Sequence, residues 1–322
     1  MIDLSRRAFA LGLPTATLVA GIPPTPAGAE STRSKVASVR AMPLAQINIG
    51  RFTVTALSDG YADMPFGYFP GRTAQEIEAA ARAQFAAQPS GIRFLFNQYL
   101  IEDGEYRILI DTGPAGSLGQ SGQLPQALAA LGLSQDQIDA VIVTHMHQDH
   151  IGGLVAGGKA NFPGAELYID RRDVAHWTDP AKRAAAPDYL QNGFKLSADV
   201  VRLYPKLQAI DGEREIVRGV SIVDLTGHTP GHIGVRVADA GQSLLMVSDM
   251  LFPVIHPATT DVNFLFEQDR AAAQAMRARF FPRAAEEGAL IAATHMPFPG
   301  LGRIVSDNGH LRWVAAAWAY QD

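Results

Sequence analysis

Four potential metal ligands lie within six consecutive residues, and they restrict the possible folds of this chain more than any other feature. The segment His145 to His150 reads HMHQDH and directly follows an apolar stretch, residues 138–143, that is typical of a buried strand. Four such side chains cannot all point into one hydrophobic core. At a strand end that continues into a turn, His145 and His147 can point one way and Asp149 and His150 the other, which predicts two neighbouring cation sites. The alternative is a polar loop that happens to be rich in histidine.

The composition limits the chemistry to oxygen and nitrogen ligands. The chain has 322 residues and no cysteine, which excludes disulfides, thiolate metal sites and a cysteine nucleophile. Its 27 Lys and Arg residues against 32 Asp and Glu residues give a formal net charge of −5, so no broad cationic surface is available to a phosphate backbone. With 47% hydrophobic residues, we expect a folded protein with a sizeable core and no nucleic-acid partner.

The first residues have the features of an export signal. Arg6 and Arg7 precede a mildly apolar stretch at 8–21, and Ala27-Gly28-Ala29 has the small residues of a signal peptidase site. The apolar stretch is shorter than the roughly 20 residues that span a bilayer. We therefore expect a twin-arginine signal peptide at residues 1–29 and a periplasmic protein with no membrane anchor. A frayed N-terminal helix is the alternative. Residues 30–45 are polar and are expected to form a linker or arm before one large domain at 46–322.

Short apolar strands dominate the centre of each half of the chain, and helices follow them. Alternation predicts a strand at 52–56, which ends at 58–60, and the capping pair Thr73 and Glu76 predicts a helix to about residue 88. Other elements are expected as a hairpin of 97–101 with 107–111, helices at 124–131 and 269–287, and strands at 138–143, 221–225, 233–238, 243–247 and 289–293. This order suggests an α/β (α+β) fold in which two sheets pack face to face with helices outside.

Three more potential ligands stand at or after the ends of apolar strands. His228 lies in the segment GHTPGH at 227–232, Asp249 follows the apolar residues 244–247, and His295 follows 291–293. With these residues, the HxHxDH run resembles the metallo-β-lactamase superfamily over residues 46–322. The resemblance implies a four-layer αββα sandwich with a dinuclear metal site at the edges of its sheets. It also implies two sets of ligands: His145, His147 and His228 for one ion, Asp149, His150 and His295 for the other, and Asp249 as a bridge.

A narrower resemblance is to methyl parathion hydrolase and to the relatives that hydrolyse lactones and aryl esters. It is carried by FTVTALSDG at 52–60, DTG at 111–113, the ligand run at 145–153, residues 227–232 and HMPFPGLG at 295–302. Members of the superfamily that use a cysteine ligand are excluded, because this chain has none. The resemblance implies export past the inner membrane, a homodimer, and two divalent metal ions per chain, of which zinc is the expected one.

The same resemblance points to a substrate pocket. Trp177 and Phe194 match two of the aromatic residues of the family's pocket, Leu118 stands where a third aromatic is expected, and Phe266 stands where a leucine is expected. These differences put phosphotriester hydrolysis in doubt. The alternative for Trp177 and Phe194 is that both are ordinary core aromatics.

Three further residues are expected behind the ligands. Asp111, in the DTG turn, is expected to orient a ligand imidazole, and Asp59 to do the same for another ligand. His232 shares a turn with His228 and is expected to bond the backbone or support a ligand.

The expected mechanism follows from the chemistry of two neighbouring cations. Ions about 3.5–4 Å apart can hold a bridging hydroxide at neutral pH and polarise a carbonyl or phosphoryl oxygen, while Asp249 or Asp149 transfers a proton. We therefore expect a hydrolase of small-molecule lactones or aryl esters. One alternative is an organophosphate triesterase of the methyl parathion hydrolase type. Another is a metal-binding protein without catalytic activity.

Overall fold

The structure is a computed structural model that describes residues 43–317. These residues belong to one compact unit, residues 41–322. The predicted signal peptide at 1–29 and most of the predicted linker lie outside the described residues. The linker prediction was wrong at its end, because strand β1 begins at Leu44, inside the range 30–45. No helix in the described part of the chain is long and apolar enough to cross a membrane.

Two sheets contain most of the strands. The first sheet has eight strands, of which seven run in the order β1-β2-β4-β5-β6-β9-β10 while β3 pairs with β4. Their bounds are β1 Leu44–Ile49, β2 Phe52–Met64, β3 Ala87–Gln88, β4 Gly91–Glu102, β5 Arg107–Ile110, β6 Ala140–Ile142, β9 Glu166–Asp170 and β10 Leu207–Ile210. The second sheet has seven strands, which are β11 Glu215–Val217, β12 Val220–Asp224, β13 Ile233–Asp239, β14 Gln242–Met246, β15 Leu290–Ala292, β16 Leu301–Asp307 and β17 His310–Ala315. A small separate ladder joins β7 Val155–Ala156 to β8 Lys159–Ala160.

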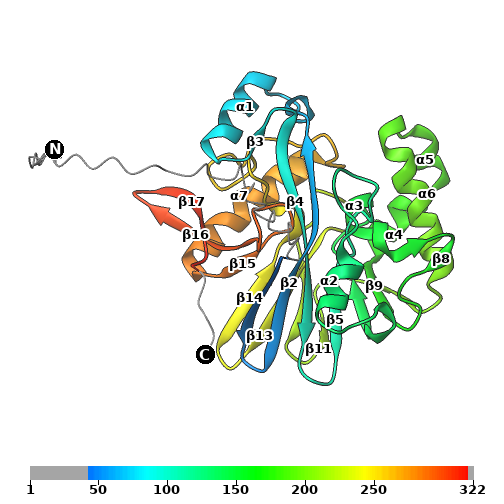
Figure 1. The fold of residues 1–322 in the computed structure, drawn as a ribbon. Coiled ribbons are helices and arrows are strands. Elements are labelled where there is room, and N and C mark those ends of the chain that lie inside the picture. The colour runs from blue at the N-terminus through cyan, green and yellow to red at the C-terminus, as the bar shows by residue number, and fades with distance from the viewer. Residues whose placement is uncertain (1–42, 318–322) are drawn as a thin grey trace, which may run out of the picture. The chain divides into compact units, whose positions relative to one another are not determined.

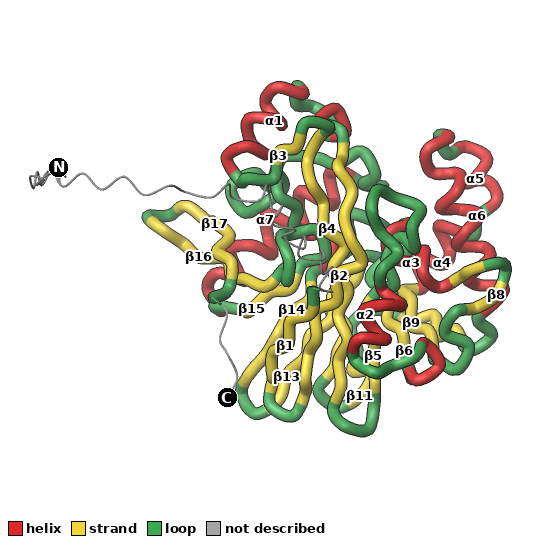
Figure 2. The backbone as a smooth tube through the Cα atoms, in the orientation of Figure 1, coloured by secondary structure: helices red, strands yellow, loops and turns green. Residues whose placement is uncertain are grey.

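Most helices lie on the outer faces of the two sheets, whereas α1 lies at one end beside β3, as Figures 1 and 2 show. The α-helices of the described residues are α1 Ala74–Ala83, α2 Leu124–Ala130, α3 Gln148–Ile151, α4 Arg171–Trp177, α5 Pro180–Ala185, α6 Asp188–Leu203 and α7 Arg270–Glu287. Short 3₁₀ turns occur at Phe66–Tyr68, Gln135–Gln137, Gly152–Leu154 and Ser248–Met250.

Three hydrophobic clusters define four layers. One cluster lies between the sheets and joins Val54 and Ile110 of the first sheet to Val235 and Met246 of the second. A second joins the other face of the first sheet to α2, α4 and α6. A third joins the second sheet to α7 through residues such as Phe280. Because strand side chains alternate between faces, each sheet is apolar on both faces, and the order helix, sheet, sheet, helix follows. The expected αββα sandwich is confirmed.

Most expected elements occur within a few residues of their predicted bounds, with two corrections. The capping box of Thr73 and Glu76 starts α1 as expected, but the helix ends at Ala83 rather than near residue 88. Strand β2 continues to Met64 beyond its expected end at 58–60, because a register irregularity between Ser58 and Tyr61 carries the pairing with β4 past the glycine. The helices α4 to α6 and the hairpin of β16 with β17 were not predicted.

Candidate metal centre

Strands from both sheets deliver the candidate ligands to one edge of the sandwich. The segment with His145 to His150 follows β6, His228 follows β12, Asp249 follows β14, and His295 follows β15. β6 runs parallel to β5 and β9, and β14 runs parallel to β15. Within each sheet, the carboxyl ends of these strands therefore lie at the same edge. Ligand sites in α/β sheets form in just this position, beyond the carboxyl ends of strands.

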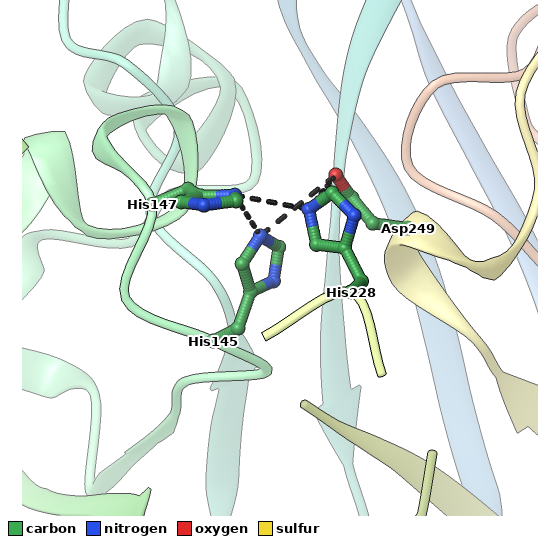
Figure 3. Close-up of side chains that lie close together, drawn as sticks. All are labelled: His145, His147, His228 and Asp249. Carbon is green, nitrogen blue, oxygen red and sulfur yellow. Dashed lines mark hydrogen bonds and ion pairs between the residues drawn. The ribbon is translucent and has the colours of Figure 1, made fainter. Parts of the chain in front are cut away.

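His145, His147 and His228, the three-histidine group, converge on one point with Asp249. The Nε2 of His145 and the Nε2 of His228 lie 2.9 and 3.0 Å from the Nδ1 of His147. Asp249 Oδ2 lies 3.2 Å from His228 Nε2 and 3.8 Å from His145 Nε2. Figure 3 shows the three rings and the carboxylate of Asp249 facing one another.

His150, His295 and Asp149, the two-histidine group, converge on the other oxygen of Asp249. Asp249 Oδ1 lies 3.2 Å from His150 Nε2 and 3.1 Å from His295 Nε2. Asp149 Oδ2 lies 3.6 and 3.5 Å from the same two nitrogens. The structure therefore brings all seven predicted ligands together, and each carboxylate oxygen of Asp249 faces a different group.

Hydrogen bonds behind the ligands fix which nitrogen of each ring faces the site. His150 Nδ1 donates to Asp111 Oδ2 at 2.8 Å, and His295 Nδ1 donates to the carbonyl of Leu95 at 2.9 Å, which leaves both Nε2 atoms as lone-pair donors. Asp111 also accepts from the backbone N–H and the hydroxyl of Thr144. The structure thus places Asp111 where the sequence analysis expected it.

The backbone beside the ligands is strained in two places. Asp111 and Ser248 have φ angles of 59° and 47°, in the left-handed region that residues other than glycine rarely occupy. The hydroxyl of Thr144 lies 2.9 Å from the hydroxyl of Ser248, so a hydrogen bond joins the loop after β6 to the loop that carries Asp249. Strain of this kind persists where surrounding contacts fix the backbone, and it is common at functional sites.

Burial and charge set the protonation of the rings. Burial, together with the neighbouring imidazoles, lowers the pKa of His145 and of His147 well below the usual value, so both rings are neutral at pH 7. Burial also opposes protonation of His150 and His295, but the carboxylates of Asp249 and Asp149 outweigh it and raise the pKa of both. A cation at the Nε2 of either ring would replace the proton that these carboxylates attract.

The donor set fits two divalent cations. In each group one atom per residue lies within 4.8 Å of the others, and nearly all of these residues are buried. The Nε2 atom of His150 is buried without a hydrogen-bond partner among the described residues, although it faces Asp249. Imidazole nitrogens with carboxylate oxygens are the ligands that Zn²⁺ takes in proteins without thiolates. Three histidines with Asp249 would hold one ion, and two histidines with Asp149 and Asp249 the other.

A mostly apolar cavity of about 330 Å³ opens directly over these ligands. His147, Asp149 and Asp249 form part of its lining. Its apolar lining includes Trp177, Leu118, Phe266, Tyr68, Phe94, Tyr189 and Phe264. A cavity with an apolar wall and a few convergent polar groups is the usual form of a small-molecule site.

Trp177, Leu118 and Phe266 line the cavity as predicted, whereas the prediction for Phe194 was wrong. Phe194 is buried behind the indole of Trp177, with the ring centroids 4.8 Å apart, and it does not reach the cavity. Its place on α6 explains this, because Tyr189, Leu190 and Gly193 of the same helix form the wall instead. For Phe194, the alternative given by the sequence holds: it is an ordinary aromatic residue of the hydrophobic core.

The prediction for Asp59 was also wrong. Its carboxylate accepts from the backbone N–H groups of Gly122 and Leu124 at 3.0 and 2.6 Å and orients no ligand imidazole. Asp59 holds the loop before α2, because β2 extends past the expected strand end toward that loop. His232 is buried, and its Nδ1 donates to the carbonyl of Leu225, as expected of a residue that bonds the backbone.

Sequence reasoning missed the remaining residues of the wall and one carboxylate. Tyr68 and Phe94 come from the aromatic-rich part of the chain before and within β4, and Phe264 comes from the loop before α7. The missed carboxylate is Asp173, which accepts hydrogen bonds from the backbone of the loops that carry His145, His147 and His228. Its only signal in the sequence is its spacing of four residues from Trp177, which places both on one face of α4.

The comparisons with known proteins agree with this geometry. The family described as "Metallo-beta-lactamase superfamily" matches residues 94–302, more than half of the chain. The chain belongs to the metallo-beta-lactamase superfamily. Within this superfamily, a solved structure described as "hydrolase AbOPH in beta lactamase superfamily" is 26% identical, with a TM-score of 0.78 over 87% of this chain and 100% of that one. The structure of AidC, described as a dizinc quorum-quenching lactonase, has the same fold with a TM-score of 0.78 at 24% identity, over 87% of this chain and 99% of that one.

Two curated relatives share sequence with part of the chain. A hydroxyacylglutathione hydrolase of Aeromonas salmonicida is 31% identical over 48% of this chain and 46% of its own length. The N-acyl homoserine lactonase AiiB of Agrobacterium fabrum is 30% identical over 48% of this chain and 62% of its own length. The chain thus spans about half the length of the curated relatives that it matches.

Proposed function

We propose that this protein is a metal-dependent hydrolase of lactones or aryl esters that binds two Zn²⁺ ions per chain. The observation that carries the proposal is the position of Asp249. Its two oxygens lie 3.2 Å from His228 Nε2 and 3.1 Å from His295 Nε2, in two different ligand groups, beneath an apolar cavity. Such an arrangement is built for two cations and a small substrate with an apolar part.

Two of the relatives support a hydrolase that acts on ester bonds. AiiB and AidC are described as lactonases. A lactone and an aryl ester both present a trigonal carbonyl carbon, so one site can act on both.

The residues of the chain have separate tasks in this proposal. When bound, the two cations would activate a water near neutral pH and polarise the carbonyl oxygen of the substrate. Asp149 lines the cavity, so its carboxylate could take a proton from the attacking water and return it to the leaving oxygen. Trp177, Leu118 and Phe266 contact the apolar part of the substrate and exclude water from the reacting bond.

Location and assembly are part of the proposal and rest on the sequence alone. Arg6 and Arg7 before a short apolar stretch support export by the twin-arginine route to the periplasm. The net charge of −5 argues against a nucleic-acid partner. The resemblance to methyl parathion hydrolase supports a homodimer.

A hydrolysis panel tests the proposed function. Purified protein is stripped with a chelator, reloaded with Zn²⁺, and assayed on dihydrocoumarin, phenyl acetate and methyl parathion. We expect activity only in the reloaded protein, with kcat/KM on the lactone or the aryl ester at least about tenfold above that on methyl parathion. The reverse order would favour the phosphotriesterase alternative. Reloaded protein that is inert on all three substrates would favour the non-catalytic metal-binding alternative.

A further inference from the structure

Asp173 bonds two loops that come from different sheets. It lies on α4 and is fully buried. Its Oδ2 accepts from the backbone N–H of Met146 at 2.8 Å, and its Oδ1 accepts from the backbone N–H of Gly231 at 2.7 Å. One rigid carboxylate therefore spans the loop after β6 and the loop after β12.

These two loops carry all three members of the three-histidine group. Met146 stands between His145 and His147, and Gly231 is in the same turn as His228. Two rings of the group thus come from the first sheet and the third comes from the second sheet. The separation of His228 from the other two rings depends on how these loops are held against each other.

The start of α4 packs closely against the loop after β12, which carries His228. A Cβ at Gly231 would lie 2.6 Å from the backbone nitrogen of Asp173 and 2.8 Å from Asp170 Oδ1, so only glycine allows this approach. Asp170 caps the helix through the N–H of Arg172, and the Arg172 side chain also pairs with Asp224 at the end of β12. The helix that supplies Asp173 therefore cannot shift without disturbing the loop of His228.

The two-histidine group has different supports. His150 is held by Asp111, and His295 is held by the carbonyl of Leu95. Neither support involves Asp173. A change at Asp173 should therefore act on one ligand group and spare the other.

We infer that Asp173 is a positioning residue that sets the spacing of the three-histidine group and thereby the affinity of that group for its cation. Trp177 lies one turn further along the same helix, with its ring centroid 5.3 Å from that of His147. Through α4, one carboxylate aligns both the metal ligands and the main aromatic wall of the cavity. This inference rests on the metal binding in the proposed function.

Asp59 provides a matched control. Like Asp173, it is buried, and it accepts two backbone N–H groups, but these belong to Gly122 and Leu124 in the loop before α2. Burial raises the pKa of each of the two carboxyls to about 6. The substitutions Asp173→Asn and Asp59→Asn therefore change the same kind of interaction, one between the two loops of the three-histidine group and one at the loop before α2.

The experiment titrates chelator-stripped protein with Co²⁺ in competition with a chelator, and follows the visible absorption of each bound ion. We expect Asp173→Asn to weaken one of the two ions by about 10 to 100-fold, as is typical when a group that orients ligands is lost, and to leave the other within about threefold. Asp59→Asn should bind both ions as the parent protein does. If stripped Asp173→Asn is unfolded, both variants are instead loaded with Co²⁺, and the loss of the visible absorption of each ion is followed as chelator is added.

The outcomes separate this inference from the proposed function. Equal Co²⁺ affinities in Asp173→Asn and Asp59→Asn, with two ions bound to the parent protein, would overturn the inference alone. An equal loss at both ions in Asp173→Asn would overturn it as well. Failure of the parent protein to bind Co²⁺ would overturn the proposed function.

Discussion

Glu267 and Arg277 form an ion pair whose two side chains are almost completely buried, with 0% and 1% exposure. Arg277 also donates to the carbonyls of Thr260 and Val262, and Glu267 accepts from the backbone N–H of Phe264. The pair thus fixes the loop that carries Phe264 and Phe266 to α7. Buried ion pairs add little net stability over apolar residues, but removing one partner leaves an uncompensated charge.

Breaking this pair should loosen the aromatic wall of the cavity. The substitution Arg277→Met leaves the buried carboxylate of Glu267 without a positive partner. We therefore expect the free energy of unfolding, measured in urea, to fall by about 3–5 kcal/mol. The KM for phenyl acetate should rise more than the KM for a small aliphatic lactone, because Phe266 is part of the aromatic wall that we expect to pack against a phenyl ring. The double variant Arg277→Met/Glu267→Gln should recover part of the stability. A loss of less than about 1 kcal/mol in Arg277→Met would contradict this role of the pair.

Trp177 should affect substrates selectively. In Trp177→Phe the apolar surface beside His147 shrinks, so we expect kcat/KM for dihydrocoumarin and phenyl acetate to fall about tenfold, with little change for a small aliphatic lactone. Phe194→Leu is the matched control, because Phe194 packs behind Trp177 without reaching the cavity. That control should lower stability and keep the selectivity. Equal losses on all substrates in Trp177→Phe would place the indole in the structural core only.

Asp59 should make stability depend on pH. Burial raises the pKa of its carboxyl from 3.8 to about 6, although the N–H groups of Gly122 and Leu124 oppose the shift. The folded state therefore holds this proton more tightly than the unfolded chain, and the stabilisation from it is present below pH 4 and is lost as the pH rises to about 6. The unfolding free energy of the parent protein, measured relative to that of Asp59→Asn, should fall by on the order of 1–3 kcal/mol from pH 4 to pH 6.5. A constant or rising difference would contradict the shift.

The ligands could be predicted from the sequence, whereas much of their surroundings could not. The run from His145 to His150 follows an apolar strand, and its spacing predicts two cation sites, whereas the parts of His228, Asp249 and His295 came from the resemblance to a known family. Asp59 and Asp173 show the limit. Each is an acidic residue in an ordinary context, and which one touches the ligand loops depends on how α4 docks against the turn after β12.

The aromatic wall was only partly predictable for the same reason. Leu118, Trp177 and Phe266 line the cavity, but Phe194 is turned away while Tyr189 and Gly193 of the same helix face it. The face that α6 turns to the cavity is set by its packing on α4, a contact between elements that a sequence pattern does not specify.

Asp249 should be more important for turnover than for substrate binding. In Asp249→Asn an amide replaces the carboxylate, which removes the negative charge shared by the two ligand groups. We expect kcat to fall by at least about 100-fold, with KM changed by less than about threefold. Asp111→Asn should weaken the ion beside His150 most, because Asp111 holds that ring directly and reaches the other group only through Thr144. Unchanged kinetics in Asp249→Asn would show that Asp249 does not join the two sites.

The most direct test of the account is the number of divalent ions that one chain binds. Protein reloaded with Zn²⁺ and freed of excess metal is measured by elemental analysis against protein concentration. The seven converging ligands predict two ions per chain, with hydrolysis lost on chelation and restored on reloading. A single tightly bound ion, or full activity in metal-free protein, would contradict the dinuclear site.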